Sequence, residues 1–280
     1  MNGKCASVLA TSLTAGCIGL FTQAVIGAES SDLSPLPQAH SHNDYEHQRP
    51  LLDALDQGFC SVEADVWLVN GELRVAHDLK DAKPGRTLQS LYLDPLQARI
   101  HRNGGRVFRD GPTITLLIDV KSDATNSYVL LRDVLKRYEK VLTRYSGERI
   151  ETNAITVILS GNRARGLMAS EVTRLAAYDG RLADLDSKDS PHFIPLISDN
   201  WTLHFKWRGR KADGPLPDLE KAKLRQIVTL THEQGRRLRF WGTTDTQEMW
   251  AELDAAGADL INTDNLPGLA EFLRTRRGVK

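Results

Sequence analysis

The segment SVEADVWL, residues 61–68, has the pattern of a buried β-strand but carries two carboxylates. Glu63 and Asp65 are two positions apart, so on a strand both side chains point to the same face. A strand of a parallel sheet that is covered on both faces is expected to be apolar throughout. Two acids inside such a strand therefore indicate a functional site, and the rest of the chain must show whether the sheet is parallel.

Seven further runs of apolar or β-branched residues have the length of a strand, and stretches with helical periodicity lie between most of them. Strands that alternate with helices indicate a parallel sheet. The strand-like runs lie at residues 35–41, 113–121, 154–161, 174–179, 193–199, 237–244 and 258–264. The helix-like stretches lie at residues 51–58, 127–145, 218–235, 246–257 and 266–277. This order predicts an α/β fold, a (β/α)8 TIM barrel.

The N-terminal residues have a different composition from the rest. A single early lysine is followed by an uncharged, largely apolar run that ends at Glu29, which predicts a secretory signal peptide over residues 1–28, cleaved after Ala28. Removing it leaves 252 residues, close to the roughly 250 of a TIM barrel. We therefore expect one barrel domain over residues 29–280 and export to the periplasm or the exterior. A lipoprotein leader cleaved at Cys17 and an uncleaved membrane anchor are the alternatives.

The charge balance excludes one class of partner. The chain has 36 basic and 36 acidic residues and a formal net charge of zero. It therefore has no excess positive charge to attract a nucleic acid backbone. The composition leaves the oligomeric state open.

Most of the predicted strands end in a polar or charged residue. In a TIM barrel the active site lies at the carboxyl ends of the strands, so polar residues are expected there. The terminal residues are His42, Asp65, Asp119, Asp179, Asp199, Thr243 and Asp264. For Asp179 and Asp199 we favour a different interpretation, because aspartate is also a preferred N-cap of the helix that follows a strand.

The acids of two neighbouring strands predict a metal site. Glu63 and Asp65 would repel each other inside a barrel unless a positive charge lay between them. The next barrel strand supplies Asp119, with Lys121 two positions further on the same face. Carboxylate oxygens are the ligands preferred by Mg2+ and Ca2+, so we expect Glu63, Asp65 and Asp119 to bind one such cation. Lys121 is then a candidate contact for a substrate phosphate.

Two histidines are candidates for proton transfer. His42 follows the first strand, and His77 ends the short extended run LRVAHD, twelve residues after Asp65. Two imidazoles beside a metal-bound anion suit the roles of general base and general acid. We favour His42 as the base and His77 as the acid. His40 shares strand parity with His42, and we expect it to support His42 by hydrogen bonding.

These motifs together resemble a known superfamily. EADVW followed by LRVAHD is similar to the core of the PLC-like and glycerophosphodiester phosphodiesterases, and FWGTTD followed by INTDNLPGL resembles their last two strands, including Trp241. SHNDYEH and FKWRG resemble in particular the altered inheritance of mitochondria protein 6-like proteins. The resemblance implies a metal-dependent phosphodiesterase in which the attacking hydroxyl belongs to the substrate, so that a cyclic phosphate forms.

The substrate is less well defined by this resemblance. Where glycerophosphodiesterases begin with His-Arg-Gly, this chain has His42-Asn43-Asp44, and it has Asp119 where they commonly have Glu. In both respects it is more similar to the spider sphingomyelinase D branch. A glycerophospho- or lipid-type diester is therefore the expected class, and hydrolysis and cyclic-phosphate formation both stay open.

Two other functions fit parts of the sequence. The HSH at residues 40–42 and Asp264 resemble the metal ligands of amidohydrolases, but those enzymes also need histidines where this chain has Asp179 and Asp199. A binding protein with little turnover on the same scaffold is the second alternative, because fold does not determine function.

The segment SDNWTLHFKWRGRKADGP, residues 198–215, follows the predicted sixth strand and is long for a βα loop. It interleaves Trp201 and Trp207 with basic residues, a combination that can pack a lipid or alcohol group beside a phosphate. We therefore predict Trp201, Trp207 and Trp241 as substrate contacts and expect transient contact with a membrane surface. The alternative is that the aromatics of the loop pack on neighbouring helices.

Overall fold

Eight parallel strands close into a barrel in the computed structural model, which describes residues 1–3 and 34–278. All eight predicted strands are present, in the order β1-β12-β11-β10-β9-β7-β4-β2, and β2 pairs with β1 to complete the ring. Their bounds are β1 (Leu36–Ser41), β2 (Phe59–Val69), β4 (Ile114–Val120), β7 (Ile155–Gly161), β9 (Ala176–Gly180), β10 (Leu196–Asn200), β11 (Arg237–Trp241) and β12 (Leu260–Thr263). The predicted TIM barrel is confirmed.

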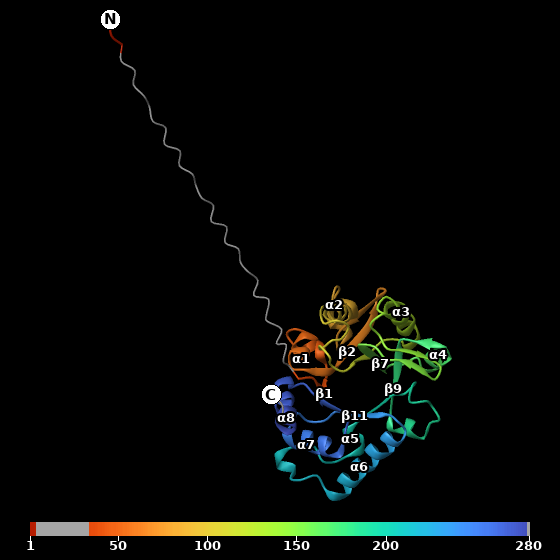
Figure 1. Ribbon diagram of the computed structural model, residues 1–280. Coiled ribbons are helices and arrows are strands. Elements are labelled where there is room, and N and C mark those ends of the chain that lie inside the picture. The colour runs from red at the N-terminus through yellow and green to blue at the C-terminus, as the bar shows by residue number, and fades with distance from the viewer. Residues whose placement is uncertain (4–33, 279–280) are drawn as a thin grey trace. The chain divides into compact units, whose positions relative to one another are not determined.

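Helices surround the strands (Figure 1). They are α1 (Leu52–Asp56), α2 (Asp94–Arg102), α3 (Ala124–Lys136), α4 (Arg165–Ser170), α5 (Trp201–His204), α6 (Asp218–Glu233), α7 (Gln247–Ala256) and α8 (Leu266–Arg277). All helices and strands of the described residues lie in the unit Asp32–Lys280. None of these helices is long and apolar enough to cross a bilayer. The predicted leader, residues 1–28, lies outside the described residues except for residues 1–3.

One predicted helix is shorter than the sequence pattern suggested. The stretch 127–145 is helical only to Lys136, and its end forms β5 (Arg144–Ser146). This strand pairs with β6 (Arg149–Glu151) and β8 (Thr173–Arg174) in a small antiparallel sheet. Tyr145 and the β-branched Thr143 two positions before it favour a strand. The positive φ of Gly147 supplies the turn to β6.

Strand β2 continues beyond the barrel and folds back as β3 (Glu72–Val75). The connection is Asn70-Gly71 with φ values of 50° and 76°, as a tight two-residue hairpin requires. The hairpin matters for the site because the backbone N–H of Ala76 donates to the carbonyl of Asp65 at 3.2 Å. It thereby returns the chain to the level of the predicted metal ligands.

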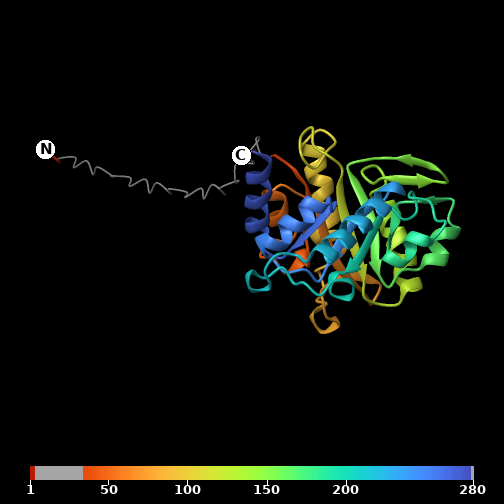
Figure 2. The same cartoon turned by 90° about the horizontal axis from the view of Figure 1, so that it is seen from below.

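The two ends of the barrel differ. Deep in the barrel Leu117, Ile158, Ala177 and Leu260 pack in an apolar cluster with Tyr145 of β5. The β5–β6 hairpin (green) lies at one end of the barrel in Figure 2, and the loop that follows β3 (orange) lies at the other. The strand β2 runs toward the end with the loop after β3, so this is the end with the carboxyl ends of the strands, which carries active sites in this fold.

Candidate active site

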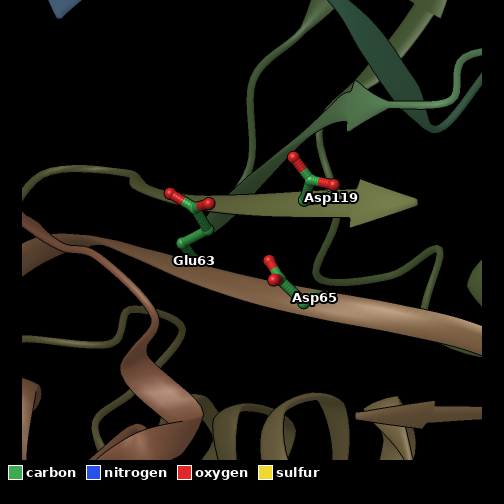
Figure 3. Close-up of side chains that lie close together, drawn as sticks. All are labelled: Glu63, Asp65 and Asp119. Carbon is green, nitrogen blue, oxygen red and sulfur yellow. The ribbon is translucent and has the colours of Figure 1, made fainter. Parts of the chain in front are cut away.

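Three carboxylates meet at the carboxyl ends of β2 and β4. Asp65 is the register partner of Asp119 on the neighbouring strand, and Glu63 lies one layer deeper on the same face of β2. Figure 3 shows the three side chains directed toward one another. One carboxylate oxygen of each lies within 4.8 Å of the others. The strand parity that predicted this set therefore agrees with the observed geometry.

The environment of Asp65 fits a divalent cation. Its carboxylate is fully buried, and burial followed by the charge of Glu63 raises the pKa of Asp65 to about 6. Its Oδ1 atom has no hydrogen-bond partner among the described residues. A buried carboxylate oxygen without a donor costs free energy, and an oxygen-preferring cation would remove that cost. Glu63, Asp65 and Asp119 thus have the donor set and the spacing for a Mg2+ or Ca2+ site.

Lys121 lies against two of the three acids. Its Nζ atom is 3.0 Å from Oδ2 of Asp65 and 3.1 Å from Oδ1 of Asp119. The side chain is partly exposed, so the ammonium also faces the mouth of the barrel. This position suits the predicted contact with a phosphate oxygen, and that contact stays a prediction.

Glu63 is held by a buried network. Arg239 of β11 donates to its Oε2 atom, and His40 of β1 contacts the same oxygen at 3.0 Å. Burial alone would raise the pKa of Glu63, but Arg239 and then His40 hold it well below its usual range. Burial and Arg239 lower the pKa of His40 to about 3, so its ring is neutral. His40 Nε2–H therefore donates to Glu63, while Nδ1 accepts from the Ser61 hydroxyl at 2.7 Å.

His40 therefore supports a predicted metal ligand, and the expectation that it supports His42 is wrong. Sequence reasoning also missed Arg239 and Tyr45, whose hydroxyl donates to Oδ2 of Asp65 at 2.8 Å. A signal for Arg239 was available. It is a charged residue in the middle of a buried strand, the same anomaly that singled out Glu63.

His42 is oriented by Asp264. Its Nδ1 atom lies 2.8 Å from Oδ1 of Asp264, which follows β12, so Nε2 is the ring nitrogen that Asp264 does not engage. Burial lowers the pKa of His42, but the hydrogen bond with Asp264 and the charge of Glu63 outweigh it, and the net pKa is raised. A carboxylate on one nitrogen of an imidazole is the arrangement that prepares the other nitrogen for proton transfer.

Asp264→Asn tests this pairing. Because the substitution removes the charge that stabilises the protonated ring, we expect the pKa of His42 to fall, so that the ring loses its proton at lower pH than in the wild type. The pKa is measured by NMR titration of the His42 ring in metal-free protein. An unchanged pKa would show that the Asp264 carboxylate does not act on His42.

His77 lies on the hairpin after β3. The ion pair formed by its ring is a loose one, with Nδ1 3.6 Å from Oδ1 of Asp78, and more than half of its side chain is exposed. Its backbone carbonyl accepts from the Trp67 indole at 3.2 Å, which fixes the chain at this point. The imidazole is thus accessible to solvent. Its role as general acid stays a prediction.

Two of the three predicted tryptophans, Trp201 and Trp207, are buried, and Trp241 is partly exposed. Trp201 is fully buried, and its ring lies 4.0 Å from that of Phe205 and at an edge-on 5.4 Å from that of Phe240. Its indole N–H donates to the carbonyl of Trp207, whose own ring is 6% exposed. These two rings form the packed base of the loop, so their burial argues against direct substrate contact. Trp241 at the end of β11 is partly exposed and remains a candidate contact.

The interpretation of Asp179 and Asp199 as helix N-caps is wrong. Asp179 is fully buried and accepts from Ser160 Oγ and Arg181 Nη1, both at 2.8 Å. Asp199 accepts from the backbone N–H of Leu182 at 3.0 Å. Both carboxylates connect neighbouring strand ends, and the N-cap of α5 is the next residue in the chain.

Gly161 at the end of β7 allows Asp119 its position. Gly161 has φ +67°, and a Cβ atom there would lie 2.3 Å from Oδ1 of Asp119. We therefore expect Gly161→Ala to displace Asp119 and to lower metal affinity by roughly 10-fold or more, the effect of disturbing the support of a ligand. The affinity is measured by titration calorimetry.

Gly147→Ala is the matched control. Gly147 also has a positive φ, +56°, but no atom lies within 4 Å of a Cβ built there. Each alanine accepts about 1–2 kcal/mol of left-handed strain. The Cβ of Gly161→Ala would also lie 2.5 Å from the Val120 carbonyl oxygen, so this variant should lose more stability than Gly147→Ala, and metal affinity is compared at a temperature where both are folded. Equal metal affinity in the two variants would contradict the role given to Gly161.

The comparisons with known proteins agree with this geometry. A family model described as the glycerophosphoryl diester phosphodiesterase family matches residues 237–267. The crystal structure of a glycerophosphodiester phosphodiesterase from Parabacteroides distasonis aligns with 87% of this chain and 99% of its own, with a TM-score of 0.50 and 16% identity. The barrel of this chain thus has the fold of a solved glycerophosphodiester phosphodiesterase, and its last two strands match the model of that family.

A second model gives the family itself. The AIM6-like phosphodiesterase domain matches residues 28–179. Altered inheritance of mitochondria protein 6 from Eremothecium gossypii is 30% identical over 89% of this chain and 73% of its own length. The homolog from Arthroderma benhamiae is 29% identical over 83% of this chain and 82% of its own length. The chain belongs to the AIM6-like phosphodiesterase domain family.

Proposed function

We propose that this protein cleaves phosphodiesters with the help of one divalent cation held by Glu63, Asp65 and Asp119. The observation that carries the proposal is the meeting of these carboxylates at the catalytic end of the barrel, with a buried oxygen of Asp65 that lacks a donor. Such a cation neutralises the charge of a bound phosphate and stabilises the added charge of the transition state.

Side chains of the protein would carry out the proton transfers and bind the phosphate. His42, oriented by Asp264, is placed to accept the proton of the attacking hydroxyl. His77, in the loop after β3, is the candidate to donate a proton to the leaving oxygen. Lys121 is placed to hold a nonbridging phosphate oxygen. The attacking hydroxyl is either that of the substrate, which gives a cyclic phosphate, or water.

The amidohydrolase alternative is not supported by the arrangement. His40, which would be a metal ligand in that class, is occupied with Glu63 and Ser61. The strands β9 and β10 carry Asp179 and Asp199 where histidines would be needed.

The experiment is a substrate screen with product identification. The protein is incubated with glycerophosphodiesters, lysophospholipids and an aryl phosphodiester in the presence of Mg2+, and the products are identified by 31P NMR. We expect at least one diester to be cleaved, and a cyclic phosphate signal if the substrate's hydroxyl attacks. Absence of cleavage across the panel with either Mg2+ or Ca2+ would reject the proposal in favour of a binding protein.

A further inference from the structure

A cavity of about 600 Å³ opens beside the acid cluster, between the chain segments that follow β4 and β7. Lys121 and Arg163 contribute cationic groups to its wall, and Tyr178 contributes an aromatic ring. Asn162 fixes the wall, because its side-chain amide donates to the carbonyls of Lys121 and Ser122 at 3.2 and 3.0 Å. The cavity is therefore bounded by connected loops at the catalytic end of the barrel.

This cavity adjoins the candidate active site directly. Lys121 lines it and is also 3.1 Å from Oδ1 of Asp119. Gly161 lines it too, and the same oxygen of Asp119 lies next to the Gly161 Cα. A substrate whose phosphate lies at Lys121 would thus place one of its substituents in the cavity.

Arg163 is the second cation in this wall, and the charges of Asp179 and Asp184 act on it from beyond ion-pair distance. Its Nη1 donates to the backbone carbonyl of Asp179, and its guanidinium lies 4.6 Å from the centre of the Tyr178 ring. Its Nε atom is buried without a hydrogen-bond partner, and Arg163 forms no ion pair within residues 34–278. Burial, and then the charge of Arg181, lowers the pKa of Arg163. An anion beside this guanidinium would therefore be stabilised.

The neighbouring Arg165 shows the contrast. It lies over the same Tyr178 ring at 5.0 Å, but it pairs with Asp184 at 2.8 Å and also with Asp189. One arginine at this ring is thus neutralised by two carboxylates, and the other is not. Asp123, the acid in the cavity wall, is exposed and accepts from the backbone N–H of Asn126 as the N-cap of α3. Solvent and the helix terminus compensate its charge.

We propose that this cavity selects a diester whose alcohol carries a second anionic group, a carboxylate or a phosphate, and that Arg163 binds that group. The inference rests on the proposed function and narrows it to a substrate class. It predicts discrimination against a quaternary ammonium substituent, which would place like charge beside Arg163.

The test compares three glycerophosphodiesters of similar size, with glycerate, glycerol or choline as the second alcohol. A fourth, glycerol phosphate, separates phosphate from carboxylate recognition. A charge-assisted hydrogen bond to arginine leads us to expect kcat/KM about 10-fold or more higher for glycerate than for glycerol, and lowest for choline. In Arg163→Gln the glycerate advantage should shrink to about 2-fold or less, whereas Arg165→Gln should keep it.

The outcomes separate the two proposals. Cleavage of all the diesters with equal efficiency by the wild type would overturn the cavity's role and leave the proposed function intact. A preference that persists in Arg163→Gln would also overturn it. If Arg163→Gln does not fold, Arg163→Lys, which retains the charge, is used in its place. The inference is then tested by whether the wild-type protein prefers the glycerate diester. Cleavage of none of them would overturn the proposed function, and this inference with it.

Discussion

Replacing Asp65 by Asn abolishes divalent-cation binding in our account and lowers phosphodiester turnover by about 10³-fold or more, since the cation supplies several kcal/mol of transition-state stabilisation. The amide has the same shape but removes one of the three negative charges and turns one ligand oxygen into a possible donor. Because folding raises the pKa of Asp65 to about 6, its buried charge does not stabilise the fold at neutral pH. We therefore expect the unfolding temperature to match that of the wild type when both are measured without divalent cations, because a bound cation would stabilise the wild type alone.

Cation affinity is measured by calorimetry, turnover by 31P NMR and stability by thermal unfolding. Asp81→Asn is the control, because Asp81 is an exposed aspartate in the loop after β3. Wild-type affinity and turnover in Asp65→Asn would show that the cation, if any, binds elsewhere. A parallel loss in Asp81→Asn would point to a general effect of charge.

His42→Ala is expected to lower turnover by about 10²–10⁴-fold, the usual contribution of a general base, with cation affinity retained. The reason is geometric, because Asp264 holds Nδ1 of the ring at 2.8 Å and does not engage Nε2, the nitrogen that we expect to accept the proton. His42 is not one of the three oxygen ligands, so turnover and cation binding should separate. That separation distinguishes this variant from Asp65→Asn.

His232→Ala is the matched control, because His232 in the last turn of α6 pairs with Asp259 at the same 2.8 Å. We expect wild-type turnover in this variant. Comparable losses in both variants would mean that removal of a histidine–aspartate pair acts through stability. Normal turnover in His42→Ala would remove His42 from the chemistry.

The barrel was predictable because its signals are local. Each strand is marked by a short apolar run, and strand parity alone places Glu63 and Asp65 on one face. Pairing of β2 with β4 then brings Asp119 level with Asp65, as consecutive strands of a parallel barrel do. The error at residues 127–145 arose where helical periodicity ran on past Lys136 into β5, a strand that pairs with β6 in a hairpin and with the more distant β8.

The surroundings of the site were less predictable because they depend on long-range contacts. Arg239 reaches Glu63 across 176 positions, and Asp264 reaches His42 across 222. Nothing in either local segment defines such a partner. Trp201 illustrates the opposite problem, because its position among basic residues suggested substrate contact, whereas three aromatic neighbours bury it completely. Exposure is a property of the folded chain, and local composition did not determine it.

The most direct measurement is the turnover of a cleaved diester by the wild-type protein in excess chelator, followed by titration with Mg2+ or Ca2+. We expect chelation to lower turnover by about 10²-fold or more, because the charge of the phosphate is then no longer compensated at the acid cluster. It also predicts recovery that saturates at one ion per chain. Full turnover in excess chelator would contradict the central claim that Glu63, Asp65 and Asp119 act through a bound cation.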